Sequence, residues 1–441
     1  MENEMPMTLA EEIRDYPRWF SSIHDLMESR VGTLSSEQAA LYADESAEIT
    51  RLEGMIPHAQ EAVKQAKKDI EANVCAMMEA EAKERFRELY DRYEITSSIA
   101  RGGFAPTDME GLKVRLRESL QNLNEIKEIA LPELKQQRDK DEEDTRQKIA
   151  QIRAEYEPVL QQRRNELVSQ YKAIKSELTL SFDALRNPEK HRKLPSSLQI
   201  GNCTFSNDGP LSDFSSEPRF DVPFEVPLTP NFAVALLSPS KNKESERVLE
   251  GVDIATTLHV LESFPKGKLK VALCSSELSS LTRLTALHHS LTNFGLSLVE
   301  KPYDTTQEYS ALFRELEKVG NEVSAKMSQE GFSSYSEFVQ AKKGKAFYRL
   351  IVLHRCLKDF NAISLKRLKA CLSDYARCGF LFLFFEDKLP ADIEPLVRTL
   401  PFHGGVAHAG DLDVYVMGLD YSMDELEIFD FVSRYAEEGK K

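Results

Sequence analysis

Residues that could bind a phosphate group follow an apolar run in the second half of the chain. The run PheAlaValAlaLeuLeu (232–237) leads into SerProSerLysAsnLysGluSer (238–245), in which Lys241 and Ser245 have the residue types of a phosphate-binding loop. Such a loop also needs glycines, because consecutive backbone N–H groups must wrap around the phosphate. This stretch contains no glycine, and Pro239 removes one N–H donor. We therefore do not expect a working phosphate loop here.

The second requirement of nucleotide chemistry is a carboxylate at the end of an apolar strand, where it would hold magnesium. The run TyrArgLeuIleValLeu (348–353) is followed by His354, Arg355 and Cys356, and the next acid is Asp359. A base or a cation in place of the acid would repel the metal ion. The sequence therefore predicts that the chain is not an enzyme of the ATPase class.

The other histidines and cysteines form no recognisable metal or catalytic motif. His288 and His289 are adjacent, so on a helix their side chains would point about 100° apart. The three cysteines nearest the C-terminus lack the paired spacing of a zinc site. The stretch 403–408 has the glycines of an ordinary turn. We predict no catalytic residue, no metal ligand and no cofactor.

Basic residues are concentrated between Gln340 and Ala370, although the whole chain has a net charge of −15. The set consists of Lys342, Lys343, Lys345, Arg349, Arg355, Lys358, Lys366, Arg367 and Lys369. Asp359 is the only acid among them. If these side chains share a face, they form a positive patch for nucleic-acid phosphates or for an acidic partner helix. A solvated rim without a ligand is the competing interpretation.

From residue 231 onward, apolar runs of strand length alternate with helical segments. Strands are predicted at 232–237, 268–273, 295–299, 348–353, 379–385 and 412–417, and a last helix is predicted to end near residue 436. Continuous apolar strands indicate a sheet that is covered on both faces. The pattern predicts a doubly wound, mostly parallel α/β domain over 231–441. Before it, alternation interrupted by prolines predicts a linker and edge strands over 187–230.

The segment 39–186 predicts a long antiparallel coiled-coil hairpin. Its first arm repeats apolar residues at alternating spacings of three and four over 49–70. The stretch 101–107, which contains glycine and proline, is the expected reversal at the tip. Pro57 predicts a restart or a kink within the first arm. A polar gap in the second arm, at 135–148, indicates either a solvated stretch or a flexible elbow.

The N-terminal residues 1–38 are expected to form short helices at the base of the hairpin. Trp19 lies among them and is the only tryptophan of the chain. We expect it to anchor the packing there; binding of a partner is the other interpretation.

The composition limits the class of protein. The chain has 441 residues, of which 41% are apolar and 29% charged, so two or three domains with a substantial core are expected. The net charge of −15 argues against a protein that coats nucleic acid or an anionic membrane over its whole surface. No secretory signal and no membrane-length apolar run are visible. We expect a cytoplasmic protein with six reduced cysteines, namely Cys75, Cys203, Cys274, Cys356, Cys371 and Cys378.

Three short motifs follow one another in the α/β segment. They are LeuHisValLeuGluSerPheProLysGlyLysLeuLysValAlaLeu (258–273), PheTyrArgLeuIleValLeu (347–353) and TyrAlaArgCysGlyPheLeuPheLeu (375–383). Together they resemble the non-motor region of bacterial FtsK/SpoIIIE-type, coiled-coil-containing DNA translocases. That family has an Asp-Pro-x-Gly-like loop where CysSerSerGlu (274–277) stands here. The resemblance implies a degenerate P-loop ATPase domain that bears an arm. It transfers no catalytic residue, and the family's glycine-rich motor is not expected because the chain ends at Lys441.

The leading functional hypothesis is a non-enzymatic scaffold or adaptor subunit. It would act with a separate DNA-directed ATPase or nuclease in a bacterial complex for DNA translocation, genome maintenance or phage defence. Two other functions stay open: a nucleotide-binding motor subunit that completes its site with a partner chain, and a protein that binds DNA directly. An arm of an SMC-like ATPase is less well supported, because the termini lack the half-site motifs. We expect a protein partner, with DNA contacted through it or through the basic residues, and a homo-oligomer is a further option.

Overall fold

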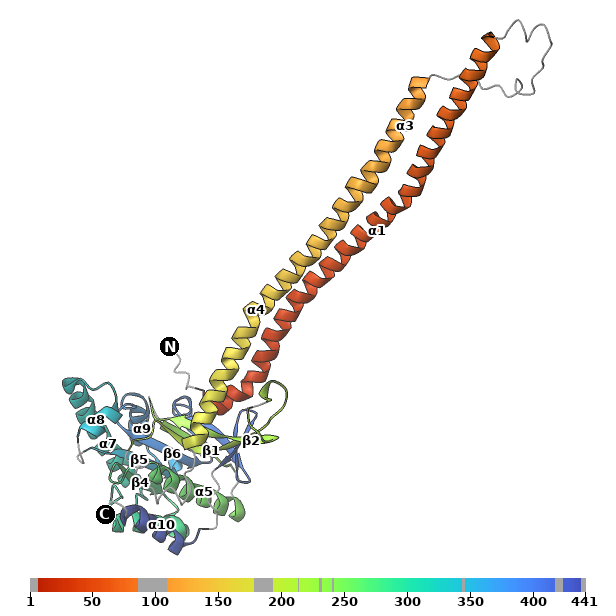
Figure 1. Ribbon diagram of the computed structural model, residues 1–441. Helices are drawn as coiled ribbons and strands as arrows, with labels where there is room; N and C mark the ends of the chain where they lie inside the picture. The colour runs from red at the N-terminus through yellow and green to blue at the C-terminus, as the bar shows by residue number, and fades with distance from the viewer. Residues whose placement is uncertain are drawn as a thin grey trace. The chain divides into compact units, whose positions relative to one another are not determined.

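The computed structural model describes residues 7–85, 109–177, 193–212, 214–229, 232–239, 242–342, 346–416 and 423–437 (Figure 1). The chain divides into two compact units, a globular unit of 1–20 and 162–441 and a helical unit of 21–161. Among the helices in the described ranges, none combines the length and the apolar content that crossing a bilayer requires.

A nine-stranded sheet forms the centre of the globular unit. Its strands are β1 (Ser197–Ser206), β2 (Arg219–Pro227), β3 (Phe232–Leu237), β4 (Leu269–Ser275), β5 (Tyr348–His354), β6 (Phe380–Glu386), β7 (Arg398–His403), β8 (Val406–Ala409) and β9 (Leu412–Val416). They lie in the order β2-β1-β9-β8-β7-β3-β6-β5-β4. The strands from β7 to β4 pair in parallel, and those from β2 to β7 pair antiparallel. The α/β class is confirmed, but the sheet is mixed and not mostly parallel.

In the antiparallel half, the edge strands β1 and β2 and the strand β9 were predicted, whereas the short strands β7 and β8 were not. Gly404 and Gly405, with φ of 59° and 89°, form the turn that joins β7 to β8. This turn was expected, but the strands on both sides of it were not. Gly201 on β1 lies against β9, where an added Cβ would come within 2.5 Å of the Tyr415 carbonyl oxygen. A glycine is therefore needed where the predicted edge strands join the rest of the sheet.

Helices cover the sheet and give it a buried interior. They are α5 (Lys243–Glu262), α6 (Thr282–Asn293), α7 (Thr306–Glu330), α8 (Tyr335–Ala341), α9 (Ala362–Ser373) and α10 (Glu425–Glu437). Helix α7 packs with α9, while α6 packs with both α5 and α10. Strand β6 is buried at every position, as its continuous apolar sequence indicates. Side-chain caps mark the starts of α5, α7, α8 and α9; Thr305 and Glu308, for example, form a capping box at α7.

The outer side of β4 is covered by the segment 296–303. A strand was predicted at 295–299, but the segment makes only two isolated bridges, Val271 with Ser297 and Cys274 with Tyr303. Its backbone bonds with Val271, Leu273 and Ser275 over distances of 2.8–3.1 Å. The outward-facing backbone groups of these β4 residues are therefore occupied by the chain itself.

The first residues of helix α1 (Leu9–Arg85) belong to the core of the globular unit. Ala10, Ile13 and Tyr16 are buried there, and the Trp19 ring stacks on Tyr16 with centroids 5.9 Å apart. The Nη1 of Arg398 on β7 donates to both carboxylate oxygens of Glu11 at 2.9 Å. The prediction of several short N-terminal helices was wrong, because α1 is one continuous helix, which also passes through Pro57.

The helical unit consists of α1 from residue 21, α3 (Met109–Asn124), a π-helical turn (Glu125–Ala130) and α4 (Leu131–Glu177), of which the unit contains the part up to 161. Figure 1 shows α1 beside α3 and α4. Three residues from α1 and α4, Met27, Val31 and Ile152, form a small buried cluster. The polar stretch 135–148 is helical. The coiled-coil geometry of the pair stays a prediction, and the predicted tip at 101–107 lies outside the described residues.

Candidate functional site

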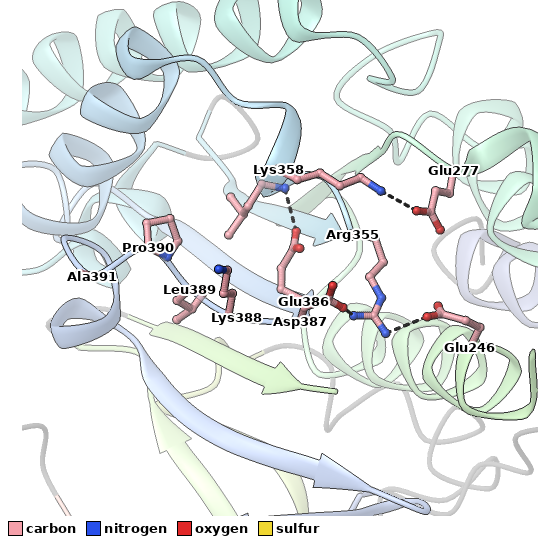
Figure 2. Close-up of a pocket in the computed structure, with 11 residues that line it drawn as sticks. Glu246, Glu277, Arg355, Lys358, Glu386, Asp387, Lys388, Leu389, Pro390 and Ala391 are labelled. Atoms are coloured by element: carbon pink, nitrogen blue, oxygen red, sulfur yellow. Dashed lines mark hydrogen bonds and ion pairs between the residues drawn. The ribbon is translucent and has the colours of Figure 1, made fainter. Parts of the chain in front are cut away.

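A pocket of about 600 Å³ lies at the carboxyl ends of the parallel strands, next to the start of α5 (Figure 2). In open α/β sheets this edge is where ligands bind. The pocket is lined by Glu246, Glu277, Arg355, Leu357, Lys358, Glu386, Asp387, Lys388, Leu389, Pro390 and Ala391. Its volume suits a small molecule. What it could bind depends on which of its polar groups are not already paired within the chain.

Arg355 is the central cation of the pocket. It follows β5 directly and is 4% exposed, and its φ of 51° is the only positive value among the described non-glycine residues. Its guanidinium donates to the Ser238 carbonyl oxygen and to Glu246 Oε1, both at 2.8 Å, and it also forms an ion pair with Asp387. A buried charge needs such partners, because desolvation would otherwise make it very costly. The guanidinium thus joins the ends of β3 and β6 to α5.

Glu386, at the end of β6, occupies the backbone donors beside Arg355. Its Oε1 accepts hydrogen bonds from the N–H groups of Cys356 at 2.8 Å and Leu357 at 3.0 Å. Burial raises the pKa of Glu386 to about 7, although these bonds and the nearby His354 and Arg355 oppose the rise. Two adjacent backbone N–H groups that could bind an anion are therefore bound by a carboxyl group of the same chain.

The rim of the pocket and the start of α5 are also internally paired. Lys358 Nζ lies 2.7 Å from Glu277 Oε1. Burial acts against ionisation of Glu277, but the hydrogen bond and the charge of Lys358, together with the nearby His354 and Arg355, outweigh it and lower the pKa of this carboxyl group. Asn242 Oδ1 accepts from Ser245 N–H at 2.7 Å and so caps α5. Lys241, the other residue of the weak phosphate-loop pattern, lies outside the described residues.

A second buried polar contact lies behind the pocket. Asp253 on α5 is fully buried, and its Oδ2 lies 2.8 Å from Nδ1 of His354 at the end of β5. Its Oδ1 accepts from the Thr257 hydroxyl at 3.2 Å. Burial raises the pKa of Asp253, and the contact with His354 opposes this rise. The contact holds α5 against β5, the strand that Arg355 directly follows.

The basic residues predicted to form a patch have several different surroundings. Lys342 pairs with Glu330, Arg349 lies over the Phe347 ring, Arg355 and Lys358 line the pocket, Arg367 pairs with Glu317, and Lys366 and Lys369 are exposed on α9. Lys343 and Lys345 lie outside the described residues. Of the seven that are described, four thus have a carboxylate partner. Contact with nucleic acid or with an acidic partner stays a prediction.

The histidines and cysteines take structural positions. His288 is buried with Nε2 at 3.2 Å from the Glu300 carbonyl oxygen, whereas His289 is exposed. All six cysteines are free thiols, and only Cys75 is exposed. Burial raises the pKa of Cys371 to about 12, so its thiol is unreactive. Within the described residues, no group of three or more His, Cys, Asp or Glu side chains is placed to hold a metal ion.

The sequence analysis missed the carboxylates that matter most here. Glu386 and Asp387 come directly after the seven-residue apolar run GlyPheLeuPheLeuPhePhe (379–385), where an acid at a strand end could have been noticed. The acid was expected after the run 348–353, where His354, Arg355 and Cys356 stand instead. Glu246 gives no sequence signal, because it looks like any acid in the first turn of a helix.

The fold and the site together define an α/β sheet protein whose ligand-binding edge is closed by internal ion pairs and hydrogen bonds. No family model matches the sequence, and no curated protein matches it. Solved structures with a similar fold include ATPases 2 and 3 of EssC from Geobacillus thermodenitrificans, with 12% identity, a TM-score of 0.40 and coverage of 56% of this chain and 49% of that one. A second such structure is ATPases 2 and 3 of Thermomonospora curvata EccC in complex with a signal sequence peptide. It has 9% identity and a TM-score of 0.40, with coverage of 56% of this chain and 48% of that one.

The cytoplasmic domain of the Thermomonospora curvata type VII secretion ATPase EccC gives 11% identity and a TM-score of 0.39, with coverage of 56% of this chain and 31% of that one. This chain therefore spans half or less of the structures it matches. The values describe a partial likeness of fold.

Proposed function

We propose that this chain is a non-enzymatic scaffold or adaptor subunit with a long helical arm. It acts beside a separate DNA-directed ATPase or nuclease, in a bacterial complex for DNA translocation, genome maintenance or phage defence. The DNA-directed partner is inferred from the sequence resemblance of 258–273, 347–353 and 375–383 to FtsK/SpoIIIE-type proteins.

One observation supports the proposal that the chain is not an enzyme. The Glu386 carboxyl group accepts hydrogen bonds from the N–H groups of Cys356 and Leu357. A nucleotide phosphate at this edge would need backbone donors and an available cation. The donors already have an acceptor, and the Arg355 cation is held by Glu246 and Asp387. To bind, a phosphate would have to displace the buried Glu386 and compete with the partly exposed Glu246 and Asp387, which supports a structural use of this edge.

The competing proposal is a nucleotide-binding subunit that completes its site with a partner chain. It is favoured by one observation, the volume of the pocket, about 600 Å³. Equilibrium binding of fluorescent ATP with magnesium, measured on the full chain alone and on its complex with the partner chain, separates the two proposals. We expect no saturable binding in either case and no turnover by the wild-type chain, whereas binding by the complex alone would favour the competing proposal.

A variant of Glu386 tests whether its carboxyl group blocks anion binding. Glu386→Ala removes the carboxyl group from the Cys356 and Leu357 amides, so any weak anion binding should rise in this variant, with Glu394→Ala, an exposed acid, as the control. Saturable binding of ATP by the wild-type chain, together with turnover that is lost in Lys241→Ala, would contradict the scaffold proposal.

A further inference from the structure

Helix α10 is capped at its start and bonded to the rest of the globular unit near its end. At its start, the Asp424 carboxylate caps the helix by accepting from the N–H groups of Leu426 and Glu427, both at 2.9 Å. Near its end, the Tyr435 hydroxyl donates to the Phe264 carbonyl oxygen at 3.1 Å, and Lys266 donates to the Ala436 carbonyl oxygen. The helix is thus already formed, and its end is attached to the globular unit.

The inner and outer faces of α10 both carry large apolar side chains. The inner face buries Ile428, Phe431, Val432 and Tyr435, which accounts for its packing against α6. On the outer face, Leu426 is 74% exposed and Phe429 is 41% exposed. Phe429 also contacts the half-buried Phe294, with ring centroids 5.5 Å apart. We call Leu426, Phe429 and Phe294 the α10 patch.

The α10 patch lies along one side of the helix and beside a hollow. Leu426 and Phe429 are three positions apart and so lie on one side of the helix, and the small Ser433 follows one turn later. A hollow of about 380 Å³, lined by residues that include Leu426 and Met423, adjoins the patch. Apolar groups beside a hollow can anchor side chains of a helix laid across them.

The charges around the patch are mainly negative. Helix α10 carries the exposed carboxylates Glu425, Glu427, Asp430 and Glu437 and a single cation, Arg434. Arg247 and Arg283 also line the hollow, but Arg283 is already paired with Glu250 at 2.9 Å. The surface therefore favours a cationic partner.

We propose that the α10 patch docks a basic amphipathic helix of another protein. The inference deepens the proposed scaffold function, since it gives the chemistry of one partner. DNA and anionic membranes carry the wrong charge for an acidic rim. A second copy placed across a two-fold axis would bring the same carboxylates against one another. A helix that bears lysines or arginines and aliphatic side chains can pack its aliphatic side chains on the patch and pair its cations with the surrounding carboxylates.

The test uses the full chain and a synthetic, fluorescently labelled peptide with leucines on one helical face and lysines on the other. We expect saturable binding that weakens about tenfold or more in Leu426→Ser and in Phe429→Ser. Ile363→Ser is the matched control, because Ile363 is a large apolar residue that is 60% exposed on α9, outside the patch. Salt should weaken the binding, and a peptide with glutamate in place of lysine should not bind.

Three results would overturn the proposal. They are equal binding by the patch variants and the Ile363→Ser control, equal binding of the acidic peptide, and a concentration-dependent dimer that Leu426→Ser abolishes. Circular dichroism checks that the variants fold. Nucleotide binding is measured in a separate experiment. If the chain binds ATP and also binds the peptide, the scaffold proposal is contradicted and the docking proposal still holds.

Discussion

The imidazole Nδ1 of His354 lies 2.8 Å from Oδ2 of Asp253, and the two side chains are 2% and 0% exposed. The contact joins the end of β5 to the middle of α5, directly behind the pocket. Neither residue has access to solvent, so the loss of one leaves the other buried without its partner.

Asp253→Ala should therefore lower the free energy of unfolding of the globular unit by about 3 kcal/mol or more. Asp253→Asn keeps an acceptor oxygen and should cost less. Urea unfolding followed by circular dichroism measures both. Glu322→Ala, an exposed acid on α7, is the control and should change stability by about 0.5 kcal/mol or less. A loss in Asp253→Ala no larger than in this control would show that the contact is dispensable.

Glu386 should make stability depend on pH. Burial raises its pKa to about 7, whereas the unfolded chain has an ordinary value of about 4.3. Between these values the folded state holds a proton that the unfolded state has released. The free energy of unfolding should therefore fall as pH rises from about 4.3 to about 7, by about 4 kcal/mol in total.

The matching variant is Glu386→Gln, which cannot titrate but still offers an acceptor oxygen to Cys356 and Leu357. Its stability relative to the wild-type chain should rise between about pH 5 and about pH 7 and then stay level. Urea titrations at several pH values measure this difference. Glu394→Gln, at an exposed acid, should show no such trend. A flat difference for Glu386→Gln would mean that the carboxyl group is ionised throughout.

Arg355 and Glu246 should be energetically coupled, because the guanidinium is buried and donates to the carboxylate at 2.8 Å. Arg355→Met should lower the free energy of unfolding by about 3 kcal/mol, since it leaves acceptors without their donor. Glu246→Gln in the Arg355→Met background should cost less than it does alone. A double-mutant cycle should give a coupling of about 1 kcal/mol or more. Additive effects would refute the coupling.

Two glycines with similar backbone angles should respond differently to alanine. Gly379 and Gly267 have φ of 76° and 74°, so alanine strains the backbone at both, by about 1 kcal/mol. At Gly379 an added Cβ would also come within 1.9 Å of the Tyr335 ring, whereas at Gly267 it meets no atom within 4 Å. Gly379→Ala should therefore lower Tm much more than Gly267→Ala. Equal shifts would mean that the Tyr335 ring moves aside freely.

The parallel strands could be predicted because each is a continuous apolar run. The sequence of β6, from Phe380 to Glu386, has one polar residue, and burial on both faces requires such a composition. Helix α7 was also predictable, since apolar periodicity and the Thr305 capping box mark it. Strands β7 and β8 were missed, because the proline and histidines of 398–409 resemble a loop.

The site could be predicted only in part. The unsuitability of His354 and Arg355 for holding magnesium followed from their charge. The carboxyl groups that pair with Arg355 could not be found in the same way, because Glu246 and Asp387 are far apart in the sequence and come together only around the Arg355 guanidinium in the folded chain. The exposed apolar face of α10 was equally hidden. A period of 3.6 residues shows that a helix has an apolar side, but not that Leu426 and Phe429 stay outside the core.

The segment 296–303 along β4 has a consequence for how the molecule behaves at high concentration. Unpaired strand edges let sheets of neighbouring molecules join, which is a common start of aggregation. Here the groups that a foreign strand would need at Val271, Leu273 and Ser275 already have partners. Without forming a strand itself, this stretch leaves no free β4 backbone group at these three residues onto which the sheet of a neighbouring molecule could add.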